Sequence, residues 1–204
     1  LKLRGLNRIK ITGKAKLLAD YGIGIFEGFF TFDDCNNCTI EGLTFENAFV
    51  GANSLNIGME LEAVDSLVIS DCSFYNFRYC ILGRQTANNI RVSSNYFNAN
   101  PSGLTGCILN GSRNIIDGNV FHEYKDTACG MTGGAKDGII SNNVVSTNTL
   151  SDNDGYTSLG IIVDENAESV IVSGNVCNGQ YVEGDSQRLG ANSLIKIGNN
   201  NTPN

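Results

Sequence analysis

The sequence predicts an all-β fold of the solenoid class, a parallel β-helix of about eight coils formed by residues 1–204 as one domain. Three observations lead to this prediction. A short apolar pattern recurs along the chain, in several places every 23 or 24 residues. Asn and Gly, with 27 and 24 residues, make up a quarter of the chain and favour tight turns. The apolar residues alternate over short runs, as they do in strands, and show no helical periodicity.

The repeat defines the first set of expected strands. Each repeat has an apolar residue, a polar two-residue turn, a small residue or Asn, and a second apolar residue five positions after the first. The repeats cover 38–45, 67–74, 90–97, 114–121, 138–145 and 170–177, and their first apolar residues are Ile40, Ile69, Val92, Ile116, Ile140 and Val172. Weaker members begin at Ile11 and Ile197, and successive gaps are 29, 29, 23, 24, 24, 32 and 25 residues. The longer gaps indicate loop insertions.

Stacked coils should align equivalent residues in columns. One expected column is buried and contains Phe45, Phe74, Phe97, Phe121, Val145 and Cys177. A second column, two positions earlier, contains Asn95, Asn119, Asn143 and Asn175. Asn tolerates the left-handed backbone conformation, and its amide can bond the next coil, so we expect an Asn ladder in the later coils.

A second set of strands precedes the repeats, at 58–62, 80–84, 107–111, 130–134 and 160–164. The two-residue period of a strand places one row inward, with Met59, Ile81, Ile108, Met131 and Ile161. The row expected to point outward contains Glu60, Leu82, Leu109, Thr132 and Ile162. Its aliphatic members suggest a covered surface, such as a contact with another subunit.

Composition excludes several classes of protein. The net charge of −7, from 14 basic and 21 acidic residues, argues against binding to duplex DNA. The sequence contains no run of 18 apolar residues, so no membrane span is predicted. Seven Cys and one His do not supply a convincing metal site, and we expect small buried thiols and no cofactor. Because the chain opens inside an apolar pattern, we expect it to be a piece of a longer protein.

The repeat, with Ile116, Asn119 and Phe121 as its clearest example, resembles the right-handed parallel β-helix of the pectate-lyase-like superfamily. The opening segments 7–19 (NRIKITGKAKLLA) and 29–47 (FFTFDDCNNCTIEGLTFEN) look most like those of bacteriophage tailspikes. That resemblance implies a homotrimer in the virion that binds, and in some cases depolymerises, a bacterial surface polysaccharide. The alternatives are a secreted bacterial lyase, hydrolase or epimerase, and a non-enzymatic stalk or adhesin at the cell surface.

The best-known catalytic motifs of that superfamily are missing. Asp33–Asp34 is the only Asp-Asp pair, the sequence has no Gly-His-Gly, and it has no Trp for the pectate-lyase motif. No named activity can therefore be assigned to a residue, and the sequence leaves open whether the protein is an enzyme.

Two faces nevertheless carry candidate residues. On the outward row, Glu60 and Glu62 are spaced about 6.6 Å along one strand, near the separation that inverting glycosidases use. Arg84 is expected one coil away, paired with Glu62, and Asp164 and Glu165 follow on a later coil. The simpler interpretation of this strip is a solvated acidic face.

The second face follows the Phe column. There His122, Tyr124 and Lys125 have the chemistry of a lyase base and a stabilising cation, and Tyr75, Arg78 and Tyr79 can contact sugars. The simpler interpretation is an ordinary turn whose side chains cover the edge of the core.

Overall fold

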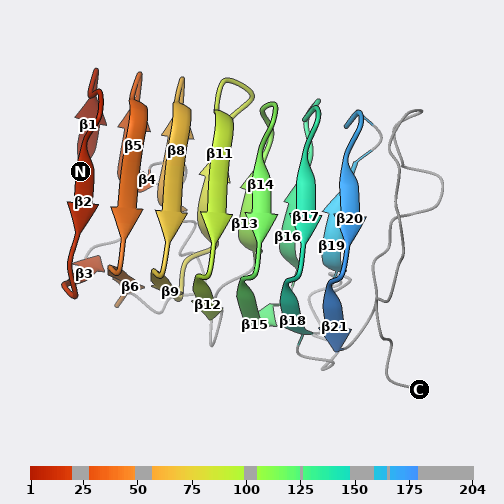
Figure 1. Ribbon diagram of the computed structural model, residues 1–204. Coiled ribbons are helices and arrows are strands. Elements are labelled where there is room, and N and C mark those ends of the chain that lie inside the picture. Colours follow the sequence, from red (N-terminus) through yellow and green to blue (C-terminus); the bar gives the residue numbers. More distant parts are fainter. Residues whose placement is uncertain are drawn as a thin grey trace.

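Three parallel sheets form the protein. The computed structural model describes residues 1–19, 28–48, 57–98, 105–124, 126–147, 159–164 and 166–178. In these residues all regular structure is β-strand, arranged in three seven-stranded sheets that we call A, B and C. Each coil contributes one strand to each sheet, and the coils follow one another along the solenoid axis (Figure 1). The prediction of an all-β parallel solenoid is confirmed.

The strands are short and uniform. Sheet A contains β1 (Lys2–Arg4), β4 (Gly28–Asp33), β7 (Ile57–Glu62), β10 (Tyr79–Gly83), β13 (Thr105–Leu109), β16 (Thr127–Met131) and β19 (Leu159–Val163). Sheet B contains β2 (Lys10–Thr12), β5 (Asn36–Glu41), β8 (Asp65–Ser70), β11 (Asn88–Ser93), β14 (Ile115–Asp117), β17 (Ile139–Ser141) and β20 (Ile171–Ser173). Sheet C contains β3 (Lys16–Ala19), β6 (Thr44–Asn47), β9 (Ser73–Tyr75), β12 (Tyr96–Asn98), β15 (Val120–Tyr124), β18 (Val144–Thr147) and β21 (Val176–Asn178).

The register of sheet B confirms the predicted repeat. Its central column, one residue from each strand, is Ile11, Ile40, Ile69, Val92, Ile116, Ile140 and Val172. These are the first apolar residues of the predicted repeats, in the predicted order. The described residues contain seven coils, and the eighth coil predicted around Ile197 lies outside them.

Some connections between sheets have a constant length, and others vary in length from coil to coil. From the second coil onward, two residues join each strand of sheet B to the following strand of sheet C. The connections from sheet C to sheet A range from two residues, between β15 and β16, to eleven, between β18 and β19. The unequal gaps in the repeat therefore arise mainly between sheets C and A.

A stack of aromatic rings fills the centre of the solenoid. Phe45, Phe74, Phe97 and Phe121 occupy one register position of sheet C and are fully buried. Successive ring centroids are 4.8, 5.1 and 4.7 Å apart, with interplanar angles of 6–10°. Each such pair contributes about 0.5–1.5 kcal/mol beyond the burial of its area. Val145 and Cys177 continue the register, as predicted.

Six cysteines are buried and take part in no disulfide, namely Cys35, Cys38, Cys72, Cys80, Cys107 and Cys129. Burial raises the pKa of Cys80 to about 12, because the interior disfavours a thiolate. The prediction of small buried thiols is confirmed for Cys72, Cys80, Cys107 and Cys129, and Cys35 and Cys38 are buried in the same way.

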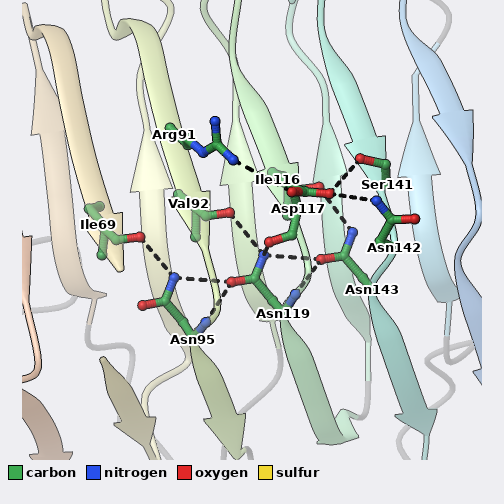
Figure 2. A network of polar contacts seen from close by, with 10 residues as sticks. All are labelled: Ile69, Arg91, Val92, Asn95, Ile116, Asp117, Asn119, Ser141, Asn142 and Asn143. Carbon is green, nitrogen blue, oxygen red and sulfur yellow. Dashed lines mark hydrogen bonds and ion pairs between the residues drawn. The ribbon is translucent and has the colours of Figure 1, made fainter. Parts of the chain in front are cut away.

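A ladder of buried Asn side chains follows the turn between sheets B and C (Figure 2). The Nδ2 of Asn119 donates to the backbone oxygen of Val92 at 2.9 Å and to the Oδ1 of Asn143 at 3.0 Å. Its Oδ1 accepts bonds from the backbone nitrogen and the Nδ2 of Asn95. Asn143 and Asn175 repeat this arrangement, so each rung ties neighbouring coils together.

One detail of the ladder was predicted wrongly. The left-handed conformation belongs to the residue before each ladder Asn, for example Ser94 and Asn142, with φ of 58° and 54°. The preceding residue makes the bend, which leaves the Asn side chain free to point inward to its partners. Before the ladder begins, Cys72 holds the equivalent position, and its backbone nitrogen donates to Asn95 Oδ1 at 2.9 Å.

Asn119→Ala should lower the free energy of unfolding by at least about 2 kcal/mol, because it leaves several buried backbone groups without partners. Chemical denaturation measured by circular dichroism tests this. The exposed Asn166→Ala is the matched control and should change stability by less than about 0.5 kcal/mol. Equal stabilities for the two variants would contradict a structural role for the ladder.

Candidate functional site

The outer face of sheet A carries one aligned row of side chains. The register aligns Thr31, Glu60, Leu82, Ile108, Gly130 and Ile162. The predicted rows were therefore wrong by one residue in the coil of Cys107, where Ile108 and Leu109 exchange faces, and shifted by two residues in the coil of Cys129, where Met131 remains in the core as predicted. Cys107 and Cys129, and not Ile108 and Met131, align with Met59 and Ile81 on the inner side. Small thiols fill core positions, and with a period of two every neighbouring side chain changes face.

Glu60 and Arg84 form an ion pair on this face. Arg84 Nε and Nη2 lie 2.9 and 2.6 Å from Glu60 Oε1, and Glu60 is only 8% exposed. The prediction that Arg84 pairs with Glu62 was wrong, although the two residues stand at the same level of adjacent strands. The carboxylate with little access to water is the one that most needs a cation, and Glu62 is exposed.

This pairing bears on catalysis by Glu60 and Glu62. The two residues share a face of β7, the arrangement expected from the sequence. An acid catalyst must present an accessible carboxyl oxygen to the leaving group, whereas Glu60 is largely buried and its Oε1 accepts two hydrogen bonds from Arg84. Glu60 is therefore better suited to position Arg84 than to donate a proton to a leaving group.

Polar side chains line the carboxyl ends of the strands of sheet A, where Glu62, Arg84, Asn110, Thr132 and Asp164 follow one another on successive coils. Thr132 Oγ1 donates to Asn110 Oδ1 at 2.7 Å. Asp164 accepts backbone N–H groups of Gly133 and Asn166 at 2.6 and 3.0 Å. Glu165, also predicted for this strip, lies outside the described residues. The aliphatic row consists of Leu82, Ile108 and Ile162, and the polar row consists of Glu62, Arg84, Asn110, Thr132 and Asp164. Together they form a strip along the axis, which we call the A-face strip.

The second predicted face is divided by the structure. Tyr75 and His122 align with Asn98 on the outer side of sheet C, and the Tyr75 and Tyr96 rings lie 5.9 Å apart. Arg78 and Tyr79 lie beyond the turn, where β10 begins.

The expectation of a surface Tyr124 was wrong. The side chain is fully buried, with Oη 3.5 Å from Cys80 Sγ, and burial raises its pKa well above the ordinary range. The register shifts between His122 and Tyr124, and Glu123 between them has a φ of 60°, which turns Tyr124 into the core. Tyr124 cannot act as a surface base, and Lys125 lies outside the described residues.

Two acids in the same segment were missed by the sequence analysis. Glu123 Oε1 lies 3.4 Å from His122 Nε2, and its Oε2 is buried without a hydrogen bond. Asp126 accepts a bond from Thr127 Oγ1 at 3.3 Å. Burial raises the pKa of Asp126 above 3.8, opposed by bonds from Thr127 and Thr105 and by the charge of Arg78. The run His-Glu-Tyr-Lys-Asp was visible in the sequence, but burial at this corner depends on turn lengths that it does not reveal.

The part of the chain that the structure describes contains no group of three or more His, Cys, Asp or Glu residues able to hold a metal ion. Within the same residues, no helix is long and apolar enough to cross a membrane.

Comparison with protein families identifies the fold. Residues 27–202 match the model of the right-handed β-helix region. The chain belongs to the right-handed β-helix family. This membership and the parallel sheets confirm the right-handed parallel β-helix. A comparison with curated proteins gives no match.

Several solved structures share this architecture. PfbA, a surface adhesin of Streptococcus pneumoniae, is 15% identical over 81% of this chain and 48% of its own, with a TM-score of 0.58. DFA-IIIase from Arthrobacter chlorophenolicus A6, without its lid, is 11% identical over 86% of this chain and 47% of its own, with a TM-score of 0.50. Tailspike protein 3 of bacteriophage CBA120 reaches a TM-score of 0.30 at 11% identity, over 98% of this chain and 50% of its own.

These similarities establish the fold and no activity. The chain spans about half the length of each of these structures. The TM-score with the tailspike is too low to support a relationship between this chain and phage tailspikes. That relationship stays a prediction from the sequence resemblance.

Asp126 predicts a pH dependence of stability. Because its pKa is raised in the folded state, the native protein binds more protons than the unfolded chain between the two pKa values. Stability should therefore fall as pH rises through that window. Asp126→Asn should raise the melting temperature near neutral pH, and the gain should vanish below the ordinary pKa of 3.8.

Thermal unfolding at several pH values tests this prediction. The exposed Glu62→Gln controls for removal of one negative charge at the surface. A melting temperature of Asp126→Asn equal to that of the wild type near neutral pH would contradict the prediction.

Proposed function

We propose that this β-helix binds a polysaccharide of a bacterial surface along the A-face strip. The observation that carries the proposal is the pairing of two rows on one face. Half-buried Leu82 and Ile162 offer an apolar surface to the C–H groups of a sugar ring, and Ile108 between them is 7% exposed. Arg84, Asn110 and Thr132 stand beside them as hydrogen-bonding groups for hydroxyls.

The repeat suits a polymer. Equivalent positions recur at about 4.8 Å along the axis, so a chain of sugars lying along the strip meets similar groups on successive coils. Binding is proposed without cleavage, because Glu60 is held by Arg84 and Tyr124 is in the core. The biological setting we propose is a phage tailspike, on the basis of the sequence resemblance described above.

Binding to purified bacterial surface polysaccharides, measured by biolayer interferometry over a panel of capsules and O-antigens, tests the proposal. Leu82→Ala and Asn110→Ala should each weaken binding about tenfold, which corresponds to about 1.4 kcal/mol. Val68→Ala is the matched control, because Val68 is a half-buried aliphatic residue on the outer side of sheet B. No binding to any polysaccharide, or equal losses in all three variants, would overturn the proposal.

The homotrimer implied by the resemblance is also proposed. A stripe of aliphatic side chains crosses the corner between sheets B and C in the last three described coils, formed by Ile115, Ile139, Ile171, Val120, Val144 and Val176. Four of its members are 40–45% exposed. Asp117, beside the stripe, is already bonded by Ser141, Asn142 and Arg91 (Figure 2). Copies that each carry −7 can approach most easily through such an uncharged surface.

Val144→Arg should dissociate the trimer into species near 21.9 kDa, measured by light scattering. Val68→Arg is the control: it lies outside the stripe in a register column that already contains Arg91, so it should leave the mass unchanged. A wild-type protein that is monomeric at high concentration, or a trimer insensitive to Val144→Arg, would contradict this arrangement.

A further inference from the structure

We propose that the glycan bound on the A-face strip is uncharged. The inference rests on the function proposed above and specifies the chemical class of its ligand. Its basis is the state of the charged groups on sheet A, where each cation already has a carboxylate partner and some carboxylates have no cation.

Among the described residues, the Lys and Arg side chains within the strands of sheet A, and Arg84 at their carboxyl ends, are all paired. Lys2 and Arg4 of β1 lie 3.0 and 3.5 Å from Asp33. Arg84, directly after β10, lies 2.6 Å from Glu60. The described strands of sheet A contain no other Lys or Arg. An acidic sugar on this face would have to displace a carboxylate that belongs to the protein, and in the case of Glu60 that carboxylate is largely removed from water.

The same face has surplus negative charge. Among the described residues, neither Glu62 nor Asp164 forms an ion pair with a cation, and the two lie at opposite ends of the polar row, with Arg84, Asn110 and Thr132 between them. At physiological ionic strength charges repel one another over about 8 Å, so a uronate or sulfate at either end of the polar row would meet repulsion from the carboxylate there. The whole chain, at −7, adds to this field.

A neutral sugar meets no such opposition. Its hydroxyl groups can donate to the free lone pairs of Glu62, Asp164 and Asn110, and bonds to a charged acceptor are about twice as strong as neutral ones. The aliphatic row contacts the ring without any requirement for charge. The pattern of groups therefore favours a hydroxyl-rich, uncharged polymer over an acidic one.

Two sets of probes of matched length test this inference: dextran, mannan and galactan as neutral polymers, and polygalacturonate, alginate and hyaluronate as acidic ones. We expect measurable binding only in the neutral set, changing less than twofold between 50 and 500 mM NaCl. Glu62→Lys should admit the acidic polymers to the strip, with binding that weakens as salt increases. Glu41→Lys, on sheet B, introduces the same charge change elsewhere and should not admit them.

The outcomes distinguish this inference from the proposed function. Wild-type binding to acidic polymers that is lost in Arg84→Ala would overturn the neutral class while leaving a polysaccharide site on sheet A. Acidic binding gained equally by Glu62→Lys and Glu41→Lys would also overturn it, because the strip would then have no special part. No binding of any polymer by the wild type would overturn the site itself.

Discussion

The backbone hydrogen bonds between successive coils are the constraint on which the rest of the structure depends. They fix each residue directly above its counterpart, so that one side chain per coil is repeated along an axis. The Phe column, the Asn ladder and the aliphatic rows all follow from that registration. A single sequence position is therefore judged by its neighbours about 24 residues away more than by those beside it.

The registration explains how much of the fold could be predicted from the sequence. The column from Ile11 to Val172 and the Phe column were recoverable because their residues are large, apolar and evenly spaced. Sheet A was harder, because residues such as Gly106, Cys107 and Gly130 have little side chain to mark which face is buried. A shift of one residue then exchanged Ile108 between the core and the surface.

The candidate site was less predictable for the same physical reasons. Whether Arg84 pairs with Glu60 or Glu62 depends on which carboxylate is buried away from solvent, and the spacing of residues along the strand does not contain that information. The position of Tyr124 depends on a bulge at Glu123, a non-Gly residue in the left-handed region that no propensity would place there. Such local departures from the repeat decide which polar groups reach solvent, so a candidate site on this fold has to be read from coordinates.

The connections between sheets differ in how many added residues they tolerate, and this affects how such a chain can diversify. The two-residue turn between sheets B and C sets the spacing between the central column of sheet B and the Phe column, so added residues there would disturb both columns and the rungs between them. The passage from sheet C to sheet A already tolerates two to eleven residues within one molecule. Evolution, or an engineer grafting new loops, can therefore rebuild the border of the A-face strip while the hydrophobic interior stays as it is.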